Sequence, residues 1–455
     1  MAHKNGETLP ILGELPGEWD VVRFGSVLSN GTRNGVYKAQ QFHGTGAKIV
    51  NMGELFAHPR LRAIPMKRVR VSSEEFNRFG LSVGDLLFAR RSLIAEGAGK
   101  CSVVCELDEP TVFESSIIRA RPNPKIADSQ YLFYLFKSRF GRYALGTILR
   151  HVAVAGITGA DLVDLPVPLP PLREQQAIAQ VLGTLDDKIE LNHRLSETLE
   201  TMTRAIFKSW FVDFDPVRAI AEGRQPFGMD AKTAALFPNS FRDSPLGEIP
   251  SGWDVGPIIG RANLLSGGTP KTDRKEYWNG DILWVSAKDV SQCRQLFLVE
   301  TERTITKTGL AESATQLVPQ FCTVVVARGA TTGRMALLGR EMAMNQTCYA
   351  LATTTDTPFW LYCVLQHEIG ELVRAAHGSV FDTITTSTFA SSRVVLPPQA
   401  VMEAFEAQVT PFFHRILAAT IESLNLAAIR DTLLPKLISG EIRVRDAERF
   451  VGTKS

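Results

Sequence analysis

The chain has 455 residues, a hydrophobic content of 44% and a net charge of +2, so it can form several globular cores and has no overall charge that would select a polyanionic partner. No apolar run reaches the roughly 18 residues of a membrane-spanning helix, and the N-terminus lacks a signal pattern. We therefore expect a cytoplasmic protein without membrane contact. Six cysteines, none in a CxxC pair, predict buried reduced thiols and no metal site.

The same series of short motifs occurs twice. GELPGEWDV at 13–21 recurs as GEIPSGWDV at 247–255, and LFARR at 87–91 corresponds to VVARG at 325–329. ITGADL at 157–162 corresponds to ITTSTF at 384–389, and each copy closes with LPP, at 169–171 and 396–398. This order predicts two copies of one domain, at 1–168 and 247–395.

Each copy mixes strand and helix patterns. LSVGDLLFARR at 81–91 and LVPQFCTVVVARG at 317–329 indicate a turn that leads into an apolar strand. QYLFYLFKSRFGRYAL at 130–145 and PFWLYCVLQHEIGELVRA at 358–375 have helical spacing, and a glycine-containing loop follows each. We predict an α+β fold with a twisted, mostly antiparallel or mixed sheet.

A long helix is predicted after each copy, within 169–211 and 396–440. Apolar or small residues recur in steps of three and four, which is typical of a coiled-coil seam. These positions are Ile178, Leu182, Leu185, Ile189, Asn192, Ser196, Leu199, Met202, Ile206 and Trp210 in the first helix, and Phe405, Val409, Phe412, Ile416, Ala419, Ser423, Leu426, Ile429, Leu433 and Leu437 in the second.

The simplest way to bury both seams is to pack the helices against each other, antiparallel, with the two domains related by a pseudo-twofold axis. Each helix would be about 60 Å long. The alternative is that each helix packs on its own domain alone. Gly183 and Pro411 predict a kink or a short leading helix, and Pro435 predicts a bend or an end.

The segment 212–246 joins the two halves. It mixes aromatic residues, proline, glycine and charge without a period, so we expect an ordered connector rather than a free linker. A tail at 441–455 follows the second helix.

Three stretches resemble the specificity subunit of type I restriction-modification systems. They are LPVPLPPLREQQAIAQVLGTLDDKIELN at 165–192, the connector with FVDFDPVRA and EGRQPFGMD, and the opening of the second copy with GEIPSGW, SGGTPKT and YWNGDILWVSAKD. The resemblance covers nearly the whole chain. It implies two target-recognition domains held by an antiparallel helix pair, each reading one half of a bipartite site in double-stranded DNA.

The resemblance also implies partners. The helix pair would set the unread spacer and bind two modification subunits, which carry the S-adenosylmethionine chemistry, and restriction subunits would join with ATP and Mg. The chain itself would be no enzyme and hold no cofactor. Its own sequence agrees: NPKI at 123–126 and LPPQ at 396–399 lack the amino-methyltransferase pattern, and GATTGR at 329–334 lacks the GK[ST] of a phosphate loop.

Two other functions stay open on the residues alone. One is an enzyme with a cryptic nuclease or methyltransferase site, and methyl transfer or cleavage by the purified chain would reveal it. The other is a coiled-coil scaffold that does not read DNA, which would show no salt-dependent DNA binding in its complex.

Candidate DNA contacts are cations and amides, because Arg or Lys suits guanine and phosphate and Asn or Gln suits adenine. In the first copy, which carries 21 Lys and Arg against 16 Asp and Glu, they are Arg33, Lys38, Arg90, Arg91, Lys100, Arg150 and His151. In the second, with 13 against 14, they are Ser266, Gly267, Gly268, Thr269, Lys271, Thr272, Lys288, Arg328, Arg334, Asn345, Gln346, His377 and Ser379.

The loop 266–272 is the favoured site in the second copy, since its small residues would let backbone amides approach a phosphate, although a plain turn explains it equally well. Any other candidate can equally be solvated surface or internally hydrogen-bonded. For the surface that meets the other subunits we predict Phe211, Phe214, Asp215 and Pro216; the alternative is that the aromatic residues pack the connector onto its own helices.

Overall fold

The structure is a computed structural model that describes residues 12–92, 97–150, 155–376 and 383–444. The chain divides into two compact units. Unit 1 comprises residues 1–188 and 426–455, and unit 2 comprises residues 189–425. Each unit therefore contains one copy of the repeated domain together with part of each long helix. We call the copies domain 1 (1–168) and domain 2 (247–395).

Domain 1 is built on a five-stranded sheet of order β2-β10-β6-β8-β4 and a three-stranded sheet of order β5-β3-β9. The first comprises β2 (Leu28–Asn34), β10 (Ile117–Pro122), β6 (Leu86–Ala89), β8 (Cys101–Val104) and β4 (Arg60–Leu61), and the second comprises β5 (Arg68–Val69), β3 (His43–Val50) and β9 (Thr111–Phe113). Two-stranded pairs join β1 (Asp20–Arg23) to β12 (Pro166–Leu169) and β7 (Arg91–Ser92) to β11 (Ala155–Gly156).

Domain 2 repeats this topology. Its five-stranded sheet has the order β16 (Ala262–Ser266), β24 (Cys348–Thr353), β21 (Thr323–Val326), β22 (Met335–Leu338) and β18 (Phe297–Leu298). Its second sheet has the order β19 (Arg303–Ile305), β17 (Trp278–Val285), β23 (Met342–Met344) and β20 (Leu317–Val318), and β15 (Asp254–Gly256) pairs with β25 (Val394–Leu396). In both domains the outermost β4–β8 or β18–β22 pair is parallel and its neighbours are antiparallel, which confirms the predicted mixed sheet and α+β class.

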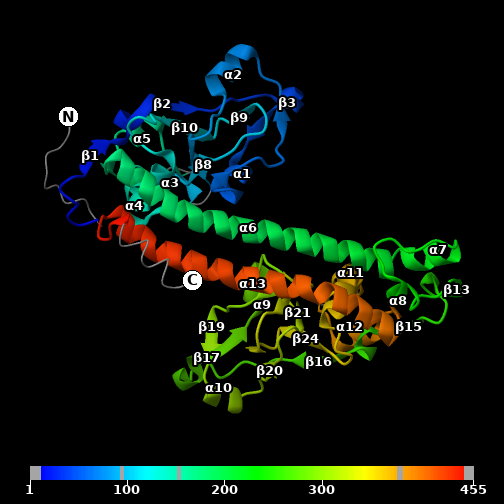
Figure 1. Ribbon diagram of the computed structural model, residues 1–455. Helices are drawn as coiled ribbons and strands as arrows, with labels where there is room; N and C mark the ends of the chain where they lie inside the picture. Colours follow the sequence, from blue (N-terminus) through cyan, green and yellow to red (C-terminus); the bar gives the residue numbers. More distant parts are fainter. Residues whose placement is uncertain (1–11, 93–96, 151–154, 377–382, 445–455) are drawn as a thin grey trace. The chain divides into compact units, whose positions relative to one another are not determined.

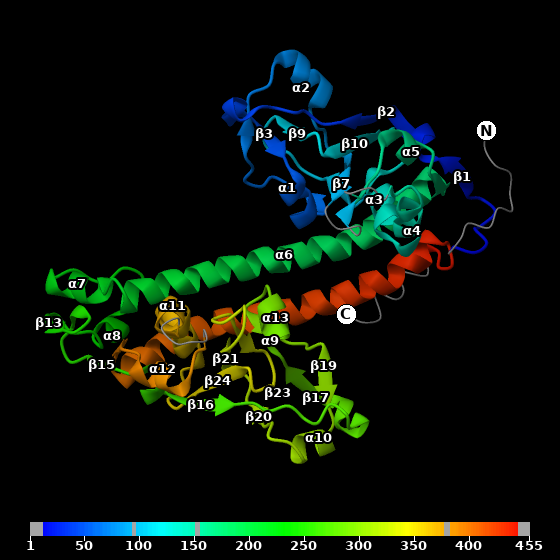
Figure 2. The same cartoon turned by 180° about the vertical axis from the view of Figure 1, so that it is seen from behind.

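Helices cover the sheets in equivalent places. Domain 1 has α1 (Met52–Ala57), α2 (Ser73–Phe79), α3 (Ser129–Lys137), α4 (Arg139–Thr147) and α5 (Gly159–Val163), and domain 2 has α9 (Ala287–Gln292), α10 (Lys307–Ala311), α11 (Pro358–Ala376) and α12 (Thr386–Ser391). In unit 1, α3 lies against β8, and in unit 2, α11 lies against β21 and β24 (Figure 1 and Figure 2). The apolar helix predicted after each strand pattern therefore forms the buried layer of its domain.

The two long helices are α6 (Leu172–Phe211) and α13 (Gln399–Ile438), each 40 residues long. In unit 1 the early part of α6 packs with the late part of α13, where Asp186 pairs with Arg430 at 2.5 Å. In unit 2 the late part of α6 packs with the early part of α13, and the amide group of Asn192 donates to Ser423 at 3.3 Å. Each unit thus shows antiparallel packing, and the alternative that each helix packs on its own domain alone is wrong.

The predicted seam is confirmed at most positions. Ile178, Leu182 and Leu185 are buried in unit 1, and Phe405, Val409 and Ile416 are buried in unit 2. The prediction is wrong at Met202, which is 44% exposed, while Thr203 next to it is 3% exposed. A strict seven-residue spacing drifts by about 20° per heptad against a straight helix, so the buried row moves on by one residue.

The expected short leading helix is also wrong, because each long helix is one continuous element. Pro411 lies on an exposed face of α13, and Ala407, whose carbonyl it cannot bond, is exposed on the same face. Water can therefore bind the carbonyl of Ala407 in place of the missing N–H, and the helix continues through Pro411. The predicted end near Pro435 is confirmed, because α13 ends at Ile438 and Gly440 follows with a φ of 72°.

The connector is ordered, as predicted. It forms α7 (Asp215–Ala221), α8 (Ala231–Ala234) and β13 (Phe241–Ser244), which pairs with β14 (Gly247–Pro250) at the start of domain 2. Among the described residues, no helix is both long and apolar enough to span a membrane.

Candidate nucleic-acid interface

In domain 1, several predicted residues gather around the turn 114–116 between β9 and β10. The backbone amide of Arg90, directly after β6, donates to this turn at 2.8 Å, and its guanidinium reaches the same turn at 3.4 Å. Gly35, after β2, packs so closely on the turn that a Cβ there would lie 2.2 Å from a carbonyl oxygen. Lys100, before β8, accepts a bond from β6 at 2.9 Å. We define the first recognition edge as Arg33, Arg90, Arg91, Lys100 and the turn 114–116.

Domain 2 has the same arrangement around the turn 345–347. A Cβ on Gly267 would lie 2.3 Å from the carbonyl oxygen of Asn345, and the amide of Ala327 donates to the turn at 2.8 Å. The carbonyl of Arg334 accepts a bond from β21 at 2.8 Å. The structure therefore brings together the end of β16, the end of β21 and the start of β22. We define the second recognition edge as Ser266, Thr269, Lys271, Thr272, Arg328, Arg334, Asn345 and Gln346.

The cations of the two edges have no acidic partner among the residues that the structure describes. Within the described part of the chain, no carboxylate forms an ion pair with Arg33, Arg90, Arg91, Lys100, Lys271, Arg328 or Arg334. Arg91, Lys271, Arg328 and Arg334 are exposed, and the others are half-buried. Uncompensated cations at the end of a rigid sheet are suited to phosphate oxygens and to base edges.

Three predicted cations differ, because acidic neighbours compensate them. Lys38 pairs with Glu75, Arg150 with Asp161 and Lys288 with Glu302, each at 2.7 Å. The bond from Lys38 lowers the pKa of Glu75, and the bond to Glu302 raises the pKa of Lys288. We therefore leave these three cations out of the interface.

In the glycine loop 266–272, the amide of Gly268 is not available for the predicted amide cradle. The amide of Gly268 already donates to the carbonyl of Met344 at 2.9 Å, so it has no bond to offer a phosphate. A Cβ on Gly268 would lie 2.5 Å from the backbone nitrogen of Thr315. The small residue here allows backbone to pack on backbone, as the alternative of a plain turn expects.

Some polar side chains of the second edge already form hydrogen bonds within the protein. Asn345 caps its own turn, since its Oδ1 accepts the amide of Thr347 at 3.1 Å and its hydroxyl at 2.7 Å. Thr269 donates its hydroxyl to Gln346 at 2.5 Å, which holds that exposed amide in place. The predicted His151, His377 and Ser379 lie outside the described residues.

An exposed aromatic residue on the first edge was missed by the sequence analysis. Tyr37 is 82% exposed, although its neighbours are held: Val36 is buried, and Lys38 is bound to Glu75. A tyrosine that is this exposed beside the edge is suited to a contact with a partner, because its ring is apolar and its hydroxyl is polar. The order of a glycine, an aromatic and a lysine after a strand was the available signal, but exposure cannot be read from it.

The predicted partner surface needs a correction. Phe211 and Phe214 are 8% and 7% exposed and pack in the core cluster of unit 2, where Phe211 meets Phe405 at a ring distance of 5.2 Å. Pro216 is buried as well, and only Asp215 is exposed. These aromatic residues fasten the connector to its own helices, which was the alternative.

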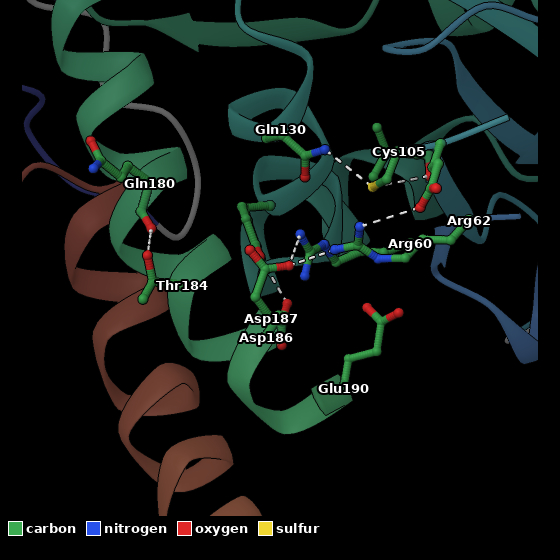
Figure 3. A network of polar contacts seen from close by, with 12 residues as sticks. Arg60, Arg62, Cys105, Gln130, Gln180, Thr184, Asp186, Asp187 and Glu190 are labelled. Atoms are coloured by element: carbon green, nitrogen blue, oxygen red, sulfur yellow. Dashed lines mark hydrogen bonds and ion pairs between the residues drawn. The ribbon is translucent and has the colours of Figure 1, made fainter. Parts of the chain in front are cut away.

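A charged network fastens α6 to domain 1 within unit 1 (Figure 3). Asp187 pairs with Arg60 at 2.8 Å and with Arg62 at 2.6 Å, both from the region of β4. Asp186 accepts the hydroxyl of Tyr134 at 2.8 Å. Burial works to raise the pKa of Asp186, but its cationic and hydrogen-bonding neighbours outweigh burial, and the pKa is lowered. Ion pairs thus hold domain 1, which contains the first recognition edge, against α6.

Two cysteines of domain 2 are buried in its core. Burial raises the pKa of the Cys322 thiol to about 11 and of Cys348 to about 12, which keeps them as unreactive thiols. Among the residues that the structure describes, no cluster of His, Cys, Asp or Glu could hold a metal ion.

The protein thus has a duplicated α+β domain, an edge of cations in each copy and two long helices. Residues 16–201 and 250–409 match the sequence model of the family described as type I restriction modification DNA specificity domain. The chain belongs to this family.

Specificity subunits of type I restriction enzymes are similar in sequence to most of this chain. The type I restriction enzyme HindI specificity subunit of Haemophilus influenzae is 27% identical over 79% of this chain and 86% of its own. The MjaIX specificity subunit of Methanocaldococcus jannaschii is 24% identical over 96% of both chains. The crystal structure of the type I restriction-modification S subunit from M. genitalium covers 92% of this chain and 96% of its own, with a TM-score of 0.61 and 14% identity, and so shares the fold.

Proposed function

We propose that this chain is the DNA-reading specificity subunit of a type I restriction-modification complex in the cytoplasm. Each domain reads one half of a bipartite site in double-stranded DNA through its recognition edge. The observation that carries the proposal is the repetition of that edge: equivalent strands in both domains bring uncompensated cations to a turn between equivalent strands. Family membership supports it.

The long helices have the size for a spacer. Each has 40 residues, or about 60 Å at the rise of an α-helix. Half-sites one helical turn apart present the same face about 34–36 Å along the duplex. The helix pair in this proposal sets the number of base pairs left unread between the halves.

The chemistry in this proposal belongs to partner subunits. Two modification subunits dock on the helices and supply S-adenosylmethionine-dependent adenine methylation, and restriction subunits join with ATP and Mg. The chain alone then transfers no methyl group and cuts no DNA. Its contribution is affinity and specificity, which salt weakens because phosphate contacts release counterions.

The test is co-expression of the full chain with its modification subunits, followed by long-read mapping of adenine methylation on the host DNA. We expect one split motif with an unread gap of constant length. A soluble, assembled complex that leaves the DNA unmethylated and binds DNA without dependence on salt would contradict the proposal and favour a scaffold.

A further inference from the structure

Two tryptophans form an aromatic shelf in domain 2. Trp278 and Trp284 lie on β17, 7% and 5% exposed, with their rings 5.2 Å apart and nearly perpendicular. The indole N–H of Trp278 donates to the carbonyl of Lys271 at 3.1 Å, and that of Trp284 donates to the carbonyl of Gly268 at 3.1 Å. The shelf is thereby joined to the loop that carries Lys271 of the second recognition edge.

The guanidinium of Arg303 lies on this shelf. Arg303 is an exposed residue of β19, directly opposite Trp284 in the β17–β19 pairing. Its guanidinium carbon is 3.4 Å from the ring centroid of Trp278 and 5.8 Å from that of Trp284. Among the described residues, no carboxylate pairs with it and no acceptor binds its N–H groups. Stacking uses one face of the guanidinium and leaves its donors, which lie in the plane, available.

The equivalent strand positions of domain 1 do not carry the two tryptophans. Val69 pairs with His43 and Ala47 in domain 1, as Ile305 pairs with Trp278 and Ile282 in domain 2. By this register Lys67 occupies the position of Arg303, and His43 and Ile49 occupy those of the two tryptophans. Domain 1 therefore has a cation at the equivalent place, but an imidazole and an aliphatic side chain stand where domain 2 has two indoles.

We propose that Arg303 is a DNA-contacting residue of domain 2, which presents a pre-oriented guanidinium to a pair of acceptor atoms on the second half-site. The inference rests on the proposed function and names a residue that determines its affinity or specificity. Two phosphate oxygens or the O6 and N7 atoms of a guanine match the spacing of the donors. Because the indole already restricts the side chain, little conformational entropy is lost on binding.

The experiment compares three variants of the full chain in complex with its modification subunits. Arg303→Ala removes the donors, and Arg303→Lys keeps the charge but loses the planar fork. Lys288→Ala is the control, since it removes one exposed cation of the same domain whose charge Glu302 compensates. Binding is measured as a function of KCl concentration on a duplex with the split target mapped for the wild-type complex and on a duplex of unrelated sequence.

The binding measurements distinguish a phosphate contact of Arg303 from a guanine contact. With a phosphate contact, Arg303→Ala weakens binding to both duplexes and reduces the slope of log K against log salt by about 1, and Arg303→Lys restores most of the affinity. With a guanine contact, Arg303→Ala and Arg303→Lys both lose roughly 5- to 150-fold on the target alone, and one position of the second half-site becomes degenerate in the methylation map.

The inference is overturned if Arg303→Ala keeps the affinity, salt slope and methylation motif of Lys288→Ala while the wild-type complex binds its target specifically. A wild-type complex without specific binding is a different outcome, because it overturns the proposed function and this inference with it.

Discussion

Gly35 and Gly267 lack a Cβ atom, and this allows the backbone of each recognition edge to pack closely. Each lies against the turn of its edge, and a Cβ would come within 2.2 or 2.3 Å of a carbonyl oxygen. We expect Gly267→Ala to lower the free energy of unfolding by about 1–3 kcal/mol, because backbone must move to admit the methyl group. The midpoint of urea unfolding, followed by circular dichroism, measures this loss.

Gly53 provides the control. It lies in α1, and no atom stands within 4 Å of its potential Cβ, so Gly53→Ala should be neutral or stabilise by up to about 1 kcal/mol. Equal effects of the two substitutions would show that the close approach at Gly267 does not exist.

Glu406 makes the stability of unit 2 depend on pH. Its carboxylate accepts the amides of Phe359 and Trp360 at 3.0 and 2.9 Å, and burial raises its pKa from 4.5 to about 7. The folded chain therefore holds this proton more tightly than the unfolded chain. Its contribution to the free energy of unfolding is largest below pH 4.5 and falls as the pH rises to 7, by on the order of 3 kcal/mol.

Glu406→Gln should remove this dependence, since the amide does not titrate and still offers an acceptor oxygen. The melting temperature of the variant should rise relative to the wild type as the pH increases from 5 to 7. Parallel curves for the two proteins would show that Glu406 does not titrate in this range.

At the scale of elements, α6 and α13 are held in unit 1 by a buried ion pair. The carboxylate of Asp186 is 9% exposed and binds Arg430 and Tyr134. Asp186→Leu leaves both partners buried with a bond lost, so we expect a loss of about 3 kcal/mol in the free energy of unfolding. The double variant Asp186→Leu, Arg430→Met should recover part of it, since it removes both members of the pair, while Lys137 and Tyr134 still lose their contacts with Asp186. Urea unfolding of the three variants, including Arg430→Met alone, measures the coupling. Additive losses would contradict it.

The sequence predicted elements better than it predicted their contacts. The repeat, the mixed sheets and the antiparallel helices follow from local patterns of apolar residues and from their duplication. The seam failed at Met202 because periodicity gives the face of a helix only to within one residue. Phe211 and Phe214 were placed on a surface because aromatic residues mark both interfaces and cores, and only tertiary packing decides between them.

The recognition edges could be predicted only in part for a similar reason. Arg90 and Arg328 follow equivalent strands, so the repeat itself located them. The sequence did not show that acidic residues compensate Lys38 and Lys288. Glu75 is 37 residues from Lys38, and Glu302 belongs to a different segment from Lys288. Arg303 was missed because its importance comes from two tryptophans on the neighbouring strand.

At the scale of the whole molecule, the proposed function predicts that substitutions in one recognition edge affect only the half-site that this edge reads. Arg90→Ala with Arg91→Ala removes two cations from the first edge, and Arg328→Ala with Arg334→Ala removes two from the second. We expect each pair to relax one half of the methylation motif and to lower the salt slope of binding by up to about 2. The losses in binding free energy should add within about 0.5 kcal/mol when the pairs are combined, because in the proposed function each pair contacts its own half-site. Relaxation of both halves by one pair would contradict this independence.

The division into units also bears on synthesis. Unit 1 is formed from residues 1–188 and 426–455, so the ribosome completes all of 189–425 before the second strand of its helix pair exists. At about 5–20 residues per second this takes roughly 10–50 s. During that time Leu182 and Leu185 lack the residues of α13 that cover them in the finished chain, such as Leu433 and Leu437. We therefore expect the nascent first half to carry an uncovered apolar helix face, which can bind chaperones or pair with a second nascent chain until residues 426–444 are made.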